Sequence, residues 1–175
     1  MSAVLFREST PAVDAIIDER RRLGIDRFDE VWEGVYVVNP APRRSHNSVV
    51  HDIVAMLRPL AEPHGFKVVA ELNLGVPSDF RIPDVAVYRR ELDDEGDDAF
   101  LDTAAIVVEV RSPGERVDKR PFYLAHGVAE VVLDDAASGT VEWLALTADG
   151  AAYVAVSASA VLPVGPADVA ALLPR

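Results

Sequence analysis

The chain has 175 residues, 50% of them apolar and 26% charged, a composition typical of a globular protein with a core of its own. Its 17 basic and 29 acidic residues give a net charge of −12 at pH 7, which argues against a protein that binds nucleic acid over its whole surface. Cysteine is absent, so disulfides, thiolate metal ligands and a cysteine nucleophile are excluded.

No apolar run approaches the roughly 20 residues that a membrane-spanning helix needs. The N-terminal stretch MSAVLFREST contains an arginine and a glutamate by position 8 and has no long apolar segment. We therefore expect neither a signal peptide nor a membrane anchor. The sequence predicts a cytoplasmic protein in which residues 1–175 form a single domain.

The first predicted element is a helix over residues 10–24, with Thr10 as its cap, Pro11 in its first turn and Gly24 at its end. The stretch DEVWEGVYVVNPAP (29–42) then predicts a pair of strands or one bent strand, with a turn or bulge at Gly34 and a stop at the prolines. Apolar residues at helical spacing over 45–65 predict a second helix, with a break or kink near its proline.

Three strand-like runs follow: FKVVAELNL (66–74), RIPDVAVY (81–88) and AAIVVEV (104–110). The third run is almost continuously apolar, as in a strand covered on both faces of a sheet. The remaining predicted elements are a short helix in DKRPFYLAHG, a strand in VAEVVLDD, and a C-terminal hairpin and tail over 141–175. These elements predict an α/β domain with a mixed central sheet flanked by helices.

Glu109 lies inside the apolar run IVVEVRSP. An ionised carboxylate in apolar surroundings is costly, so it becomes neutral, pairs with a cationic group or binds a metal ion. Asp84 opens the preceding strand, and two close carboxylates do not both remain ionised without a cation between them. Mg²⁺ takes oxygen ligands and one or two carboxylates, so these residues are candidate ligands. Lys119, one of only two lysines, begins the helix after Glu109.

Each of these residues also has a simpler interpretation. Asp84 could accept a backbone N–H at a strand end, and Glu109 could pair with Arg111, because alternate residues of a strand share a face. Lys119 could be a solvated helix residue, and His46 could lie at a helix start without a partner. The other histidines show no metal-ligand spacing and are interpreted as structural or exposed: His51, His64 and His126.

Taken in order, the motifs resemble the PD-(D/E)XK nuclease superfamily and, more closely, its Uma-type restriction endonuclease family. The resemblance covers roughly residues 28–147 and rests on DEVWEGVYVVNPAP, the helix that starts at His46, RIPDVAVY, IVVEVRSP and KRPFYLAHGVAEVVLDD. It implies a restriction-endonuclease-like fold and a metal-dependent endonuclease that hydrolyses phosphodiester bonds in DNA, with Mg²⁺ or Mn²⁺ as its cofactor.

The resemblance also implies roles for individual residues. Asp84 and Glu109 would bind the metal, together with the main-chain carbonyl of Val110. Glu30 would complete or orient the metal site. Lys119 would be the catalytic lysine, moved onto the helix.

His46 and Arg111 would contact phosphate. Arg111 occupies the lysine position of the E-x-K motif, where an arginine can clamp phosphate but is a poor base. A second interpretation is therefore a catalytically silent relative that acts as a DNA-binding, regulatory or structural module. A third is an oligomerisation protein without a ligand. A homodimer paired through the apolar edge of the C-terminal hairpin would suit an enzyme that cuts both DNA strands.

Overall fold

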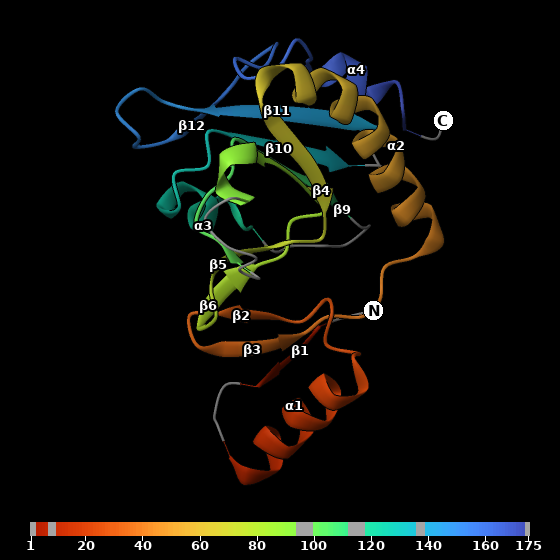
Figure 1. The fold of residues 1–175 in the computed structure, drawn as a ribbon, viewed down its shortest axis with the longest axis vertical. Coiled ribbons are helices and arrows are strands. Elements are labelled where there is room, and N and C mark those ends of the chain that lie inside the picture. The colour runs from red at the N-terminus through yellow and green to blue at the C-terminus, as the bar shows by residue number, and fades with distance from the viewer. Residues whose placement is uncertain (1–2, 7–9, 94–99, 112–117, 136–138, 174–175) are drawn as a thin grey trace.

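The computed structural model describes residues 3–6, 10–93, 100–111, 118–135 and 139–173. Within these ranges the chain forms two mixed six-stranded sheets and four α-helices (Figure 1). The helices are α1 (Pro11–Leu23), α2 (Arg44–Ala61), α3 (Arg120–Ala125) and α4 (Pro166–Ala170). No helix in the described ranges is long and apolar enough to cross a membrane.

The larger strands form one sheet in the order β12-β11-β10-β9-β7-β4. Its central pair, β9 and β10, is parallel, and α3 lies in the connection between the two strands. All other pairs in this sheet are antiparallel. The strands are β4 (Phe66–Ala70), β7 (Val85–Arg89), β9 (Ile106–Arg111), β10 (Glu130–Asp135), β11 (Thr140–Leu146) and β12 (Tyr153–Ala155).

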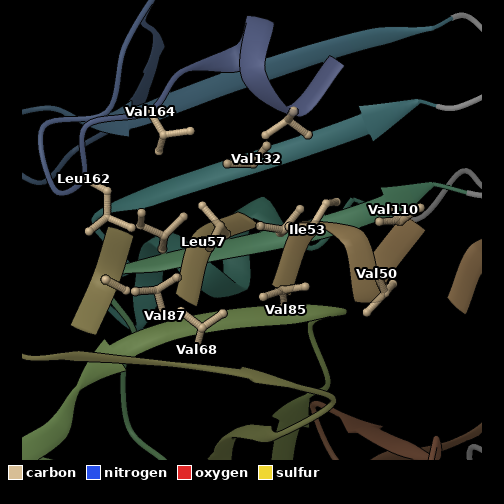
Figure 2. Packing of buried hydrophobic residues seen from close by; sticks show 14 of the residues in the cluster. Val50, Ile53, Leu57, Val68, Val85, Val87, Val110, Val132, Leu162 and Val164 are labelled. Atoms are coloured by element: carbon tan, nitrogen blue, oxygen red, sulfur yellow. The ribbon is translucent and has the colours of Figure 1, made fainter. Parts of the chain in front are cut away.

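Strand β9 is buried on both faces, as its apolar run predicts. Ile106, Val108 and Val110 belong to the core cluster that includes α2 and α4. Figure 2 shows Ile53 and Leu57 of this cluster lying over the sheet strands. Val107 faces the opposite cluster, which includes Tyr123 of α3. Glu109 shares the face of Val107, because alternate residues of a strand point the same way.

The short strands form a second sheet in the order β1-β3-β2-β6-β5-β8. These strands are β1 (Val4–Phe6), β2 (Glu30–Trp32), β3 (Val35–Val38), β5 (Asn73–Val76), β6 (Asp79–Arg81) and β8 (Phe100–Leu101). The prediction of an α/β domain with a mixed sheet flanked by helices is confirmed, although the structure has two mixed sheets. The predicted strand 66–74 is wrong as a single element. It is divided between the two sheets because Glu71, with φ of 57°, turns the chain.

The two long helices agree with their sequence signals. Thr10 caps α1 by accepting the N–H of Val13, and Gly24 ends it with φ of 64°. The helix predicted over 45–65 is α2, which starts at Arg44, includes Pro59 and ends at Ala61. A 3₁₀ turn, Glu62–His64, follows before Gly65.

Candidate active site

Asp84 joins three separate elements at the start of β7. Its Oδ2 accepts the backbone N–H of Val110 in β9 at 2.7 Å. Its Oδ1 lies 2.9 Å from Nε2 of His46, in the first turn of α2. Asp84 thus accepts a backbone N–H, as its simpler interpretation expects. That N–H belongs to Val110, which directly follows Glu109 in β9. The interpretation of His46 as a residue without a partner is therefore wrong.

Glu109 lies on the side of β9 that faces α3. The hydroxyl of Tyr123 donates a hydrogen bond to Glu109 Oε1. Lys119 Nζ lies 3.2 Å from Oε1 and donates to Oε2 at 3.3 Å. Arg111 pairs instead with Glu142 of β11, with 3.8 Å between Nη2 and Oε2. The cation beside Glu109 is therefore Lys119, which comes from the helix that follows the strand.

Lys119 lies largely out of solvent immediately before α3, so the interpretation as a solvated residue is wrong. Its side chain is 13% exposed, and Nζ lies 3.0 Å from Glu30 Oε1. Nζ also donates to the backbone carbonyl of Ile82 at 3.1 Å. The ammonium group is thus held by two carboxylates and one carbonyl, which fixes its position.

Glu30 is itself fixed on all sides, although it lies on the short strand β2. Its side chain is 2% exposed. Oε1 accepts the N–H of Ile82 at 2.6 Å, and Oε2 accepts Nε1 of Trp32 at 2.9 Å and Nδ2 of Asn39 at 3.1 Å. Buried carboxylates are stable only when their oxygens are paired in this way. Glu30 therefore orients Lys119.

The proximity of these charges changes the acidity of the site. Burial raises the pKa of Glu109 to about 7; the Lys119 charge opposes the rise, while the charges of Asp84 and Glu30 add to it. Burial by itself would lower the pKa of Lys119, but Glu109, Glu30 and Asp84 outweigh burial and raise it. Burial and the charge of Glu109 raise the pKa of Tyr123 well above its usual range. The site therefore has one carboxyl that is easily protonated and one firmly held cation.

Sequence reasoning missed Tyr123 and Arg81. Tyr123 follows Lys119 by four residues, a spacing that places both side chains on one helical face, so the signal was available. The Arg81 guanidinium lies 4.6 Å from the ring centre of Trp32 and 4.2 Å from that of Phe122. It also donates to the carbonyl of Val31 at 2.7 Å. Arg81 thus connects the strand of Glu30 to the helix behind Lys119, which no local pattern indicates.

The donor set fits a hard divalent cation. Asp84 and Glu109 are close enough that the charge of one raises the pKa of the other. Each carboxylate oxygen has lone pairs beyond those used in these hydrogen bonds. The described residues contain no group of three or more His, Cys, Asp or Glu side chains that could hold a metal ion. Two carboxylates suffice for Mg²⁺, which completes its octahedron with water, whereas a structural zinc site needs four protein ligands.

Residues 25–168 match the model of the Uma2 family, described as "Putative restriction endonuclease". The chain belongs to this family. Every predicted site residue, from Glu30 to Lys119, lies inside the region that matches Uma2, whereas β1 and α1 lie outside it. The family predicted from the sequence motifs is confirmed.

Among solved structures, five chains match. One is the crystal structure of a "putative nuclease belonging to DUF820" from Anabaena variabilis, with 18% sequence identity and a TM-score of 0.67. The match covers 83% of this chain and 91% of that chain. At this identity the likeness shows the fold alone, and the restriction-endonuclease-like fold is confirmed. No curated protein matches the chain.

Proposed function

We propose that this Uma2 protein is a metal-dependent endonuclease that hydrolyses phosphodiester bonds in DNA. The observation that carries the proposal is the meeting of Asp84, Glu109 and Lys119 from three different parts of the chain, with Lys119 Nζ 3.2 Å from Glu109. A lysine held between two carboxylates away from solvent is a costly structural element, because an apolar side chain would fill the space without the cost of desolvation.

Asp84 and Glu109 would hold Mg²⁺ or Mn²⁺. We assign the main-chain carbonyl of Val110 as the third donor. The N–H of Val110 already points at Asp84, and the N–H and C=O of one strand residue face the same neighbouring strand. When bound, the metal supplies a Lewis acid that polarises the phosphate and lowers the pKa of a bound water.

The protein's own side chains would position the reactants. Lys119, fixed by Glu30, would place a positive charge beside the phosphate, where charge develops during the attack of water. Tyr123 fixes the carboxylate of Glu109, and His46 fixes that of Asp84. His46 would also contact phosphate, since it lies against a proposed metal ligand.

DNA is the proposed substrate because basic side chains surround this site in an otherwise acidic chain. Arg43 and Arg44 are exposed at the start of α2, next to the turn that contains His46. Arg111 is 39% exposed at the end of β9. A small cluster of arginines contacts a few phosphates and suits a local DNA footprint, which is compatible with the net charge of −12.

A catalytically silent DNA-binding module is the second candidate. It is favoured by Arg111 at the lysine position of the E-x-K motif. The position of Lys119 favours the active enzyme, because a lysine from α3 reaches the same carboxylates. Both candidate functions predict DNA binding, and only the active enzyme predicts DNA cleavage.

The test combines calorimetric titration of Mn²⁺ with cleavage of plasmid DNA, using the wild type, Asp84→Asn, Glu109→Gln and Lys119→Met. The first two substitutions keep the shape of the side chain and remove a metal ligand. Glu62→Gln is the matched control, because Glu62 is an exposed acid in the turn after α2, at the other end of that helix from His46. We expect Mn²⁺ binding to vanish in Asp84→Asn and Glu109→Gln, cleavage to vanish in all three, and Glu62→Gln to behave like the wild type.

Circular dichroism of each variant separates loss of the site from loss of the fold. The titration is repeated with a short DNA duplex, since phosphate completes some metal sites of this kind. Cleavage by Asp84→Asn at the wild-type rate would refute the assignment. DNA binding in Ca²⁺ without cleavage in Mg²⁺ or Mn²⁺ would establish the silent module.

A further inference from the structure

The N-terminal part of the chain has an apolar surface that the proposed nuclease does not use. Val4, Ile16, Leu23 and Ile25 form what we call the N-terminal patch, and each is 47–52% exposed. Five of the seven exposed large apolar side chains in the described ranges lie within the first 25 residues, the fifth being Leu5 on the other face of β1. Such a concentration of exposed apolar side chains is typical of an interaction surface.

Helix α1 is attached to the protein through an ion pair as well as through the partly buried side chains of Val13 and Ile17. None of its 13 residues, all of which the structure describes, is buried. Arg20 binds Asp29 through Nε at 2.6 Å and Nη2 at 2.9 Å. Asp29 also accepts the hydroxyl of Tyr36 at 2.9 Å and the N–H of Asn39 at 3.2 Å. This network fixes the helix while Ile16 and Leu23, on its outer side, remain exposed to solvent.

The residues of the patch lie on neighbouring elements. Ile16 and Leu23 lie two turns apart on one face of α1. Ile25 follows directly after the Gly24 cap, and it lines a hollow of about 520 Å³ together with Val4 of β1. Figure 1 places α1 and β1 together at one end of the molecule, far from α4 and β11. The patch thus has both a projecting helix face and a recess that could receive a side chain.

The charge of the N-terminal segment indicates which kind of partner covers the patch. Residues 1–28 contain five arginines and five acidic residues, so they are neutral, and the rest of the chain carries the net charge of −12. A neutral apolar surface does not suit DNA, which requires basic side chains. It does suit a second copy of this acidic chain, because two copies repel each other least where they are neutral. Within the described residues β1 pairs with β3 alone, and its other edge lies at the same end of the molecule.

We propose that the N-terminal patch is the interface of a symmetric homodimer, with α1 of one copy packed against the same region of the other. A two-fold interface uses the same patch on both copies, so a surface that is apolar, neutral and offers both a ridge and a recess is self-complementary. The interface lies outside the segment that matches Uma2, except for Ile25. It does not depend on the proposed nuclease activity.

Sedimentation equilibrium of the full chain tests this proposal. The wild type is expected at twice the chain mass of 18.9 kDa. In Ile16→Glu/Leu23→Glu the dimer dissociation constant should rise at least about 100-fold, because two central apolar contacts are replaced by charges. Val154→Glu is the matched control, since Val154 is 48% exposed on β12, at the edge of the other sheet. It should remain dimeric.

A second measurement uses the absence of cysteine from the sequence. A single cysteine in Ile16→Cys, Leu23→Cys or Ile25→Cys can be joined by a short bis-maleimide only to another copy, and such mild changes leave the fold intact. Linked dimers are expected for these patch variants and not for Val154→Cys. A monomeric wild type at all concentrations, linkage only through Val154→Cys, or a double variant that remains dimeric would overturn the proposal.

Discussion

Lys119 Nζ lies 3.0 Å from Oε1 of Glu30, a residue of the sheet of short strands that contains β2. This contact joins the two sheets at the candidate site. Glu30 belongs to β2 of one sheet, and Lys119 directly precedes α3, the helix that follows β9 of the other sheet. The same lysine touches Glu109, so one ammonium group connects both sheets at the point where the proposed metal ligands meet. The stability of the protein and the geometry of its site should therefore change together.

Glu30→Gln should lower the free energy of unfolding by about 2 kcal/mol. The amide keeps the shape of the side chain, but it removes the charge beside Lys119 and turns an N–H₂ group toward a donor, either Ile82 or Trp32. Urea unfolding measures the change. Glu19→Gln is the control, because Glu19 pairs with Arg22 in the exposed part of α1 and its loss should have no measurable effect. Equal losses in both variants would show that the burial of Glu30 contributes nothing.

Arg81→Lys should lower the free energy of unfolding by about 2 kcal/mol, although the charge is kept. The planar guanidinium lies between the rings of Trp32 and Phe122 and donates to Val31, and an ammonium group cannot do all of this. Thermal unfolding followed by circular dichroism measures the effect. Arg89→Lys changes an exposed arginine over Phe66 at 5.2 Å and should cost clearly less. If the two variants unfold at the same temperature, Arg81 does not connect β2 to α3.

Glu109 should make the protein less stable as the pH rises from about 4.5 to about 7. Its pKa is higher in the folded chain than in the unfolded chain, so the folded state binds the proton more tightly in this range, and stability falls as the proton is lost. Relative to Glu109→Gln, the wild type should lose up to about 3 kcal/mol across the range. Urea unfolding at a series of pH values measures the difference.

Mn²⁺ should reduce this pH dependence, because a bound cation favours the ionised carboxylate. The effect of Mn²⁺ should be missing in Glu109→Gln. A wild type and a variant with parallel stability profiles would show that the pKa of Glu109 is the same in the folded and the unfolded chain.

The sequence by itself determined the elements whose signals are local. The cap at Thr10 and the glycine at 24 delimit α1, and helical periodicity delimits α2. The apolar run of β9 predicted a strand buried on both faces, and the acid inside it indicated a site. The order of the motifs was enough to indicate the family. These features depend on neighbouring residues along the chain, so the sequence displays them directly.

Only the tertiary structure decided which groups meet. Glu71 adopts a left-handed conformation and divides the predicted strand 66–74 between two sheets, which no propensity indicates. The partner of Glu109 is Lys119 and not Arg111, because α3 folds back over the sheet face to which Glu109 points. Glu30 reaches Lys119 through the pairing of β2 in the second sheet. Contacts between distant segments depend on strand order and packing, and periodicity along the chain contains neither.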